Sequence, residues 1–274
     1  MAAALDESGL TDAFQTFNAL SGALEASYRD LEMQVARLNA ELAEARLERR
    51  RQERLATLGE MAARLAHDVR TPLAAALLYA SRLGLEGIDD ASRREIAGKV
   101  VGRLKHLEGL VADMLAFARG GGGLVTRCDV SALLESAAQS LAPRIGGRTQ
   151  LTIRTRAPGI AVRGNAEALV GALVNLANNA FDAVQDVAEP VIEIEASREG
   201  ANALIRVRDN GPGIAATERA RVFEPFYTTR PGGTGLGLAV VKSVTLAHGG
   251  AVRIEDSTAG ACFALTLPVL EAEA

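Results

Sequence analysis

The stretch ARGGGG, residues 118–123, divides the chain into two parts with different hydrophobic periodicities. Four consecutive glycines would lose more backbone entropy in a helix than other residues do, so they predict a hinge, placed over 120–128. Before this stretch, apolar residues recur at spacings of three and four, as in amphipathic helices. After it, short segments alternate apolar and polar residues, as half-buried strands do. The sequence therefore predicts a helical part followed by an α+β part.

The part before the hinge has the apolar spacing of long helices. Over residues 21–56 the apolar residues lie three and four positions apart, which predicts a coiled coil preceded by an N-terminal tail over 1–20. The apolar stripe resumes in a shifted phase at Leu58. This shift marks the entry into a second helical domain, placed over 57–119.

Two helices of this second domain are expected to lie antiparallel. The later helix runs from about residue 92 to 119, and the connection GLEGIDD, residues 84–90, is short enough for a helical hairpin. Because one hairpin has only a thin core, two copies are expected to pair in a four-helix bundle. The chain is therefore predicted to be a homodimer.

The part after the hinge, placed over 129–270, has the pattern of an α+β sandwich. Helices are expected near residues 130–142 and 165–187. Strands are expected at LTIRT (151–155), VIEIEAS (191–197), ALIRVRD (203–209), AVRIEDS (251–257) and ACFALTLPV (261–269). The segments 191–197 and 203–209 are expected to pair as a hairpin. Helices segregated against a mixed or antiparallel sheet form such a sandwich.

The composition excludes several classes of protein. A net charge of -4 gives no general attraction to nucleic acid or to anionic membranes, so no direct nucleic-acid contact is expected. No window of about 18 uninterrupted apolar residues and no signal peptide are visible, which predicts a cytosolic chain without a membrane span. The two cysteines, Cys128 and Cys262, are too few for a disulfide framework or a zinc site and are expected to be reduced thiols.

The segment RLAHDVRTPL, residues 64–73, places a polar cluster on an otherwise apolar-striped helix. His67 lies two positions from the stripe on either side, about 200° around the helix, so its imidazole is expected to point into solvent. Thr71 lies one turn further along the same face, and Asp68 can select the imidazole tautomer. Pro72 cannot donate to the Asp68 carbonyl, so the helix is expected to bend or loosen there. The alternative is an ordinary surface histidine beside a chance proline.

Three later motifs are suited to a nucleotide. Asn175 and Asn179, four apart on one helix face, offer amide oxygens that suit Mg²⁺, although asparagine pairs are also common as caps. Asp209 ends a strand and is followed by a glycine-containing loop, which by itself is also an ordinary tight turn. The segment GGTGLGLAVVKSV, residues 232–244, is a glycine-rich loop leading into a helix, an arrangement that directs backbone N–H groups at phosphate.

Together these motifs resemble the H, N, G1, F and G2 boxes of the sensor histidine kinases of two-component systems. In that order they are AHDVRTPL (66–73), NLANNAFDA (175–183), DNGPGI (209–214), VFEPFYTT (222–229) and GTGLGL (233–238). The resemblance extends from about residue 55 to the end of the chain. It implies a dimerisation and histidine phosphotransfer hairpin, followed by an ATP-binding domain of the kind shared with Hsp90, MutL and gyrase.

The resemblance also implies roles for individual residues. His67 would attack the γ-phosphate of ATP, Asp68 would be its general base, and Thr71 would orient water for dephosphorylating the partner. Asn179 would hold Mg²⁺, and Asn175 would support the triphosphate. The adenine amino group would donate to Asp209, whereas Gly211 and Gly213 would make room for the ring. The other implied ATP-binding residues are the phosphate-binding loop, Gly233, Thr234, Gly235, Leu236 and Gly237, and a mobile lid that includes Phe223, Thr228 and Thr229.

One position departs from the family pattern, because Asp182 stands where many members have a basic or aromatic residue. A phosphate contact from that position is therefore in doubt.

The segment RLAHDVRTPLAAALLYASRL, residues 64–83, is similar to the phosphotransfer helix of flagellar-regulatory sensor kinases. Such kinases phosphorylate a σ54-dependent activator, so the resemblance implies a separate response regulator as partner, and a second activity as its phosphatase. The sequence does not separate kinase from phosphatase. The alternatives from other classes are an adenine-nucleotide switch or a serine protein kinase with the same ATP-binding fold, and a purely structural coiled coil. Neither nucleotide-binding alternative needs an outward-facing His67, and a coiled coil needs no nucleotide motifs.

Overall fold

The computed structural model describes residues 7–60, 62–85, 87–120, 122–145, 149–156, 158–230 and 233–270. The chain divides into two compact units, residues 1–53 and 54–274, which are described separately. Among the described residues, no helix combines the length and apolar character that a membrane crossing requires.

The described part of the first unit lies in helix α1 (Glu7–Glu60). Residues 7–20 are thus helical rather than part of the tail predicted over 1–20, whereas residues 1–6 lie outside the described range. The reason is that Phe14 and Phe17 extend the three-and-four spacing of the apolar seam backwards. The side chains of this seam are exposed in the single chain, for example 60% at Leu24 and 62% at Leu38.

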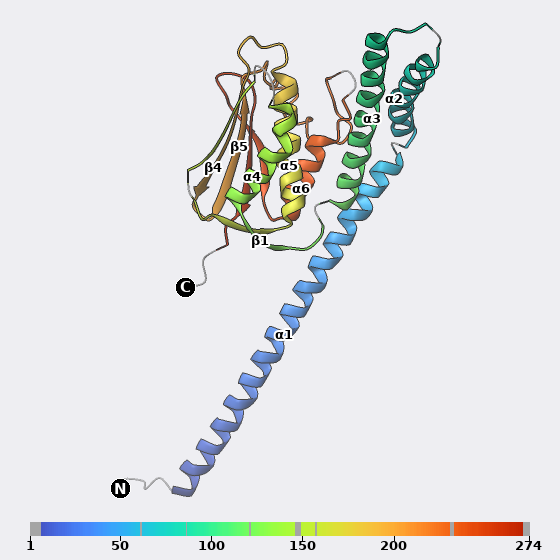
Figure 1. Cartoon of the computed structure of the whole chain (residues 1–274). Coiled ribbons are helices and arrows are strands. Elements are labelled where there is room, and N and C mark those ends of the chain that lie inside the picture. The colour runs from blue at the N-terminus through green and yellow to red at the C-terminus, as the bar shows by residue number, and fades with distance from the viewer. Residues whose placement is uncertain are drawn as a thin grey trace. The chain divides into compact units, whose positions relative to one another are not determined.

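In the second unit, helices α2 (Ala62–Leu83) and α3 (Asp90–Arg119) pack against each other as the predicted hairpin (Figure 1). Asp89 caps the start of α3, because its Oδ1 accepts from the Ser92 backbone N–H at 2.8 Å. Gly120, at φ 60°, ends α3 by donating its N–H to the Ala116 carbonyl at 2.9 Å. The glycine-rich stretch therefore does stop the helix, as its sequence predicts.

The rest of the second unit is an α/β sandwich (Figure 1). Its five-stranded sheet has the order β2-β4-β5-β7-β6, in which only β2 and β4 pair in parallel. The strands are β2 (Gln150–Thr155), β4 (Val191–Glu199), β5 (Asn202–Asp209), β6 (Ala251–Glu255) and β7 (Cys262–Pro268). The helices are α4 (Val130–Leu141), the short 3-10 helix η1 (Ala142–Arg144), α5 (Ala166–Ala183) and α6 (Gly237–Ala247). The α+β prediction and the hairpin of β4 with β5 are confirmed.

Two short strands were not predicted. Strand β1 (Thr126–Asp129) pairs antiparallel with β3 (Ala161–Gly164), so the predicted hinge over 120–128 ends in a strand. Neither TRCD nor AVRG alternates strictly between apolar and polar residues, so no strand signal is visible in either segment. Helix α5 also ends at Ala183 rather than near 187, because Val184 forms the C-cap.

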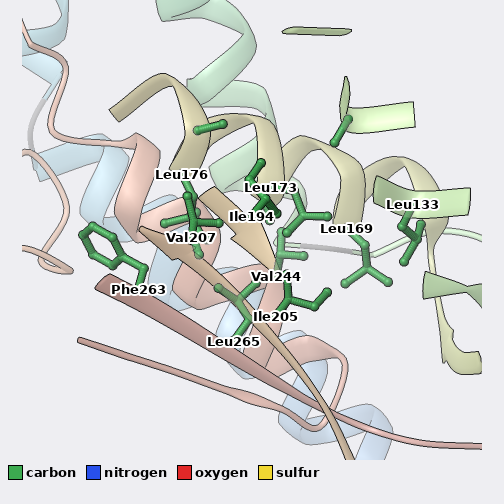
Figure 2. Close-up of a cluster of buried hydrophobic side chains, with 14 of the residues drawn as sticks. Leu133, Leu169, Leu173, Leu176, Ile194, Ile205, Val207, Val244, Phe263 and Leu265 are labelled. Carbon is green, nitrogen blue, oxygen red and sulfur yellow. The ribbon is translucent and has the colours of Figure 1, made fainter. Parts of the chain in front are cut away.

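The core lies between the sheet and the three helices that cover one of its faces (Figure 2). In α5 the positions at spacings of four and three are all buried, and strand β4 buries Ile192, Ile194 and Ala196 while Glu193 and Glu195 turn outward. Full burial of each leucine or isoleucine contributes about 1.5–3 kcal/mol. Figure 2 labels Leu133, Leu169, Leu173, Leu176, Ile194, Ile205, Val207, Val244, Phe263 and Leu265. This core fixes the strand and helix ends on which the nucleotide motifs lie.

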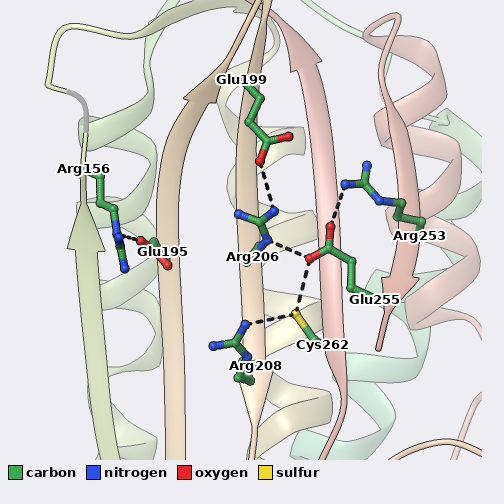
Figure 3. A network of polar contacts seen from close by, with 8 residues as sticks. All are labelled: Arg156, Glu195, Glu199, Arg206, Arg208, Arg253, Glu255 and Cys262. Atoms are coloured by element: carbon green, nitrogen blue, oxygen red, sulfur yellow. Dashed lines mark hydrogen bonds and ion pairs between the residues drawn. The ribbon is translucent and has the colours of Figure 1, made fainter. Parts of the chain in front are cut away.

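The other face of the sheet is covered by ion pairs (Figure 3). The Arg206 guanidinium contacts Glu255 at 2.7 Å and Glu199 at 3.1 Å, and Arg156 pairs with Glu195. The sheet therefore has one apolar and one polar face, as is common for a mostly antiparallel sheet at a surface. Cys262, beside this network, and Cys128 are buried free thiols, as predicted.

Candidate functional site

His67 lies on α2 with 77% of its side chain exposed, which confirms that the ring points outward. Its Nδ1 lies 3.6 Å from Asp68 Oδ1, too long for a direct hydrogen bond but close enough for electrostatic interaction or a bridging water. Arg64, one turn earlier, places its Nε 4.0 Å from Asp68 Oδ2. The carboxylate of Asp68 therefore lies between a guanidinium and the imidazole.

Thr71 is exposed on the same face as His67, and its hydroxyl donates to the His67 carbonyl at 3.1 Å. Pro72 is buried inside α2, and the helix continues on both sides of it. Because proline has no N–H, the Asp68 carbonyl loses its usual intrahelical donor. The expected bend at this point stays a prediction.

The second group of candidate residues surrounds a cleft of about 860 Å³ in the same unit. The cleft brings together the amides of α5, the end of β5 and the glycine-rich loop before α6. Its lining includes these predicted ATP-binding residues: Asn175, Asn179, Asp209, Gly213, Thr228, Thr229, Gly233, Thr234, Gly235 and Gly237. Segments from four separate boxes, N, G1, F and G2, thus meet at one concave surface.

Six predicted residues do not line this cleft. His67, Asp68 and Thr71 lie on α2, outside its lining. The other three support the cleft: Gly211 donates its N–H to Asp209, Leu236 is fully buried in the core, and Phe223 packs edge to face on Phe263 with 6.2 Å between ring centroids. In this structure Phe223 packs against the core beside the cleft, and the lid role predicted for it stays a prediction.

Asp209 is only 5% exposed and is one of the residues that line the cleft. Its Oδ1 accepts from the backbone N–H of Gly211 at 2.9 Å and of Ala261 at 3.1 Å. Burial raises the pKa of Asp209, whereas these two donors and the charge of Arg230 oppose the rise. Because both backbone donors reach Oδ1, Oδ2 is available to a ligand donor.

Sequence reasoning missed Gly260 and Ala261, which hold Asp209 from the loop between β6 and β7. Gly260 has φ 68°, and a Cβ there would lie 2.0 Å from the Asp209 carbonyl oxygen, so only glycine fits. The glycine directly before an apolar strand, in TAGA at 258–261, was the available sequence signal.

The glycine-rich loop is held by backbone contacts. Gly235 has φ 66°, and a Cβ there would lie 2.4 Å from the carbonyl carbon of Phe226. The backbone N–H of Phe226 donates to the Gly235 carbonyl at 2.9 Å. The Thr234 hydroxyl accepts from the Leu236 N–H at 3.0 Å and donates to Asp113 of α3 at 3.3 Å. Helix α6 begins at Gly237, so its positive N-terminal end lies at the cleft.

The residues at the cleft fit an Mg²⁺ ion held mainly by a nucleotide. Among the described residues, no cluster of three or more His, Cys, Asp or Glu side chains could hold a metal by itself. Mg²⁺ commonly takes one or two protein oxygens and fills its other positions with water and phosphate. Asn179 lies in the cleft lining with an amide oxygen of this kind, and Asn175 directs its Nδ2 at the Gly237 carbonyl, 3.5 Å away.

A basic cluster at the cleft was also missed. Arg144 and Arg230 both contact Asp182, the position that departs from the family pattern. Neither arginine lies in a recognisable motif, so only the fold could bring them to this site.

Two family models match the chain. The model of the "His Kinase A (phospho-acceptor) domain" matches residues 57–123, and that of the "Histidine kinase-, DNA gyrase B-, and HSP90-like ATPase" matches residues 164–271. The chain is 38% identical over 223 residues to the sensor protein kinase FleS of Pseudomonas aeruginosa, covering 81% of this chain and 55% of FleS. It spans about half the length of the curated relatives it matches.

Two solved structures are similar in fold. Histidine kinase ThkA, in complex with the response regulator protein TrrA, matches with a TM-score of 0.69 at 24% identity, over 84% of this chain and 67% of that one. Full-length ShkA, in complex with AMPPNP, matches with a TM-score of 0.57 at 30% identity, over 78% of this chain and 47% of that one. The two matched domains, their order and the motifs they carry show that this chain belongs to the sensor histidine kinases of two-component systems.

Proposed function

We propose that this chain transfers the γ-phosphoryl group of ATP to His67 and then to an aspartate of a separate response regulator. The observation that carries this proposal is that one unit holds both an exposed histidine and a cleft suited to adenine. The side chain of His67 is 77% exposed, and the buried carboxylate of Asp209 in the cleft is an acceptor for the adenine amino group. An outward imidazole can be reached in turn by ATP and by a second protein. A nucleotide switch or a serine kinase has no use for it.

The position of Asp68 determines which nitrogen of His67 reacts. Its carboxylate lies on the Nδ1 side of the ring, at 3.6 Å, so it favours the tautomer with the proton on Nδ1. Nε2 then carries the lone pair and attacks the γ-phosphorus, while the bond to the bridging oxygen of the β-phosphate breaks and ADP leaves. The resulting imidazolium loses its Nδ1 proton toward Asp68, directly or through water.

The cleft would select and hold the nucleotide. Asp209 Oδ2 accepts from the adenine amino group; guanine presents an oxygen at that position, which the carboxylate repels. The N-terminal end of α6 and the glycine-rich loop bind phosphate. When bound with ATP, Mg²⁺ neutralises part of the triphosphate charge, and Asn179 is the residue that would hold it.

The apolar surface of the hairpin supports a homodimer. Leu77 and Leu78 of α2 are 63% and 64% exposed, and Val101 and Leu115 of α3 are both 51% exposed. A second hairpin would cover these side chains in a four-helix bundle. The seam of α1 would pair in the same way as a coiled coil.

The similarity to FleS supports a flagellar-regulatory role. A σ54-dependent activator as partner stays a prediction from the sequence resemblance. Thr71, exposed one turn from His67, favours phosphatase activity toward this partner as a second function. The cytosolic location stays a prediction.

The proposal is tested by incubating the purified chain with radiolabelled Mg-ATP. We expect an acid-labile, base-stable phosphoryl adduct, as a phosphoramidate gives. His67→Gln should abolish the label and retain nucleotide binding. Label that persists in this variant would refute the assignment.

A further inference from the structure

The motifs around the cleft predict a triphosphate site, but the charged side chains that line it make the binding of a triphosphate unfavourable. In the α/β sandwich, the described residues that line the cleft contribute four carboxylates: Asp182, Asp186, Asp209 and Glu218. The basic side chains among them are Arg144 and Arg230. A nucleotide triphosphate brings several further negative charges, which Mg²⁺ neutralises only in part. Beside the N-terminal end of α6, the two arginines are therefore the positively charged side chains of this domain at the cleft that can offset the repulsion.

Both arginines are held at one carboxylate. Arg144 donates from Nη2 to Asp182 Oδ1 at 2.6 Å and from Nη1 to Asn178 Oδ1 at 2.9 Å. Arg230 donates from Nη1 to Asp182 Oδ2 at 3.4 Å and from Nη2 to the Asn179 carbonyl at 2.9 Å. Asp182 thus uses one oxygen for each guanidinium.

The fold places this cluster next to the residue expected to hold Mg²⁺. Asn178, Asn179 and Asp182 lie within one turn of α5, so they share a region of its surface. Arg144 comes from the end of η1, and its guanidinium lies over the Phe181 ring at 5.3 Å, which restricts its orientation. Arg230 comes from the segment directly after the F box.

The cluster is accessible enough to exchange partners. The side chains of Arg144, Asp182 and Arg230 are 39%, 38% and 41% exposed. Ion pairs at this exposure are weak, whereas guanidinium contacts to phosphate are charge-assisted and often bidentate. A triphosphate that enters the cleft can therefore replace Asp182 as the partner of both arginines.

We propose that Arg144 and Arg230 bind the triphosphate of ATP, and that Asp182 is the internal counterion that positions them until the nucleotide arrives. This inference rests on the proposed binding of ATP. It explains how the cleft accepts an acidic residue where many family members have a basic one. The local charge of the three side chains is +1, which restores the sign that a phosphate site needs.

The test measures the affinity of the full chain for AMPPNP, ADP and AMP in the presence of Mg²⁺ by calorimetry. For Arg144→Gln and Arg230→Gln we expect AMPPNP affinity to fall about tenfold, ADP affinity to fall less, and AMP affinity to stay unchanged. Arg154→Gln is the matched control, because Arg154 is 63% exposed on the sheet and outside the cleft lining. Its affinities should equal those of the wild type.

The counterion is tested with Asp182→Asn against Asp186→Asn, which removes the same charge from the same cleft. We expect AMPPNP affinity to rise more in Asp182→Asn than in Asp186→Asn. In Asp182→Asn the arginines need not break an ion pair before they contact the phosphates. Arginine variants with unchanged AMPPNP affinity, or with equal losses for all three nucleotides, would overturn the phosphate contact. A fall in AMPPNP affinity in Asp182→Asn would overturn the proposed replacement of Asp182 by the triphosphate. A wild type that binds none of the nucleotides would instead contradict the proposed function itself.

Discussion

The two halves of the proposed reaction are built in opposite ways. The His67 side chain is exposed and has only loose electrostatic neighbours, whereas Asp209 is 5% exposed and fixed by two backbone donors. The difference follows from what each must do. A phosphoryl carrier must be reached by two large partners, but a site that distinguishes adenine must present a buried polar group that a wrong base leaves unpaired. We therefore expect substitutions in the cleft to alter stability or nucleotide affinity, and substitutions beside His67 to alter only phosphoryl transfer.

The largest effect should come from the loop that holds Asp209. Gly260→Ala forces a Cβ into the Asp209 carbonyl at a positive φ, which should cost about 3 kcal/mol of unfolding free energy. Gly200→Ala is the matched control: φ is 59°, but its Cβ meets nothing within 4 Å, so it should cost about 1 kcal/mol. Urea unfolding measures both, and equal costs would show that the contact with Asp209 is easily relieved.

The next effect concerns the adenine contact. Asp209→Asn replaces the acceptor oriented toward the adenine amino group and should weaken ADP binding about 100-fold. Asp256→Asn, with a side chain 94% exposed, is the control and should bind normally. Unchanged ADP affinity in Asp209→Asn would remove Asp209 from the nucleotide site.

Beside His67 the expected change is confined to one reaction. Thr71→Ala should slow dephosphorylation of the response regulator about tenfold and leave self-phosphorylation within about twofold, because its hydroxyl lies next to the histidine without supporting the cleft. The decay of a phosphorylated regulator measures the first rate. Equal decay with both proteins would exclude this role.

The smallest effect is the pH dependence of stability. Burial raises the pKa of Asp209 in the folded chain above its ordinary value of 3.8, so the folded state binds the proton more tightly than the unfolded state. Stability therefore falls as pH rises through the raised pKa. Asp209→Asn should be more stable than the wild type at pH 7, and this gain should vanish at low pH. A loss of stability in the variant at pH 7 would show that the carboxylate is needed to hold the loop.

How far the sequence predicts this molecule depends on how local each feature is. The hairpin, α5 and the outward ring of His67 follow from spacings along one helix, so periodicity was enough. The contact of Ala261 with Asp209 joins residues 52 apart, and that of Arg144 with Asp182 joins residues 38 apart. Such contacts depend on how strands and helices pack, and the pairing of β1 with β3 is of the same kind. For this reason the motifs predicted the nucleotide cleft, but not the loop and the arginines that support it.

The most direct test locates the phosphoryl group after reaction with Mg-ATP, by mass spectrometry at neutral pH, in the wild type and in Asp209→Asn in parallel. We predict a phosphorylated peptide carrying His67 in the wild type and almost none in Asp209→Asn at the same ATP concentration. Phosphate on a different residue, or equal phosphorylation of His67 in both proteins, would contradict transfer from a nucleotide held at Asp209 to the exposed histidine.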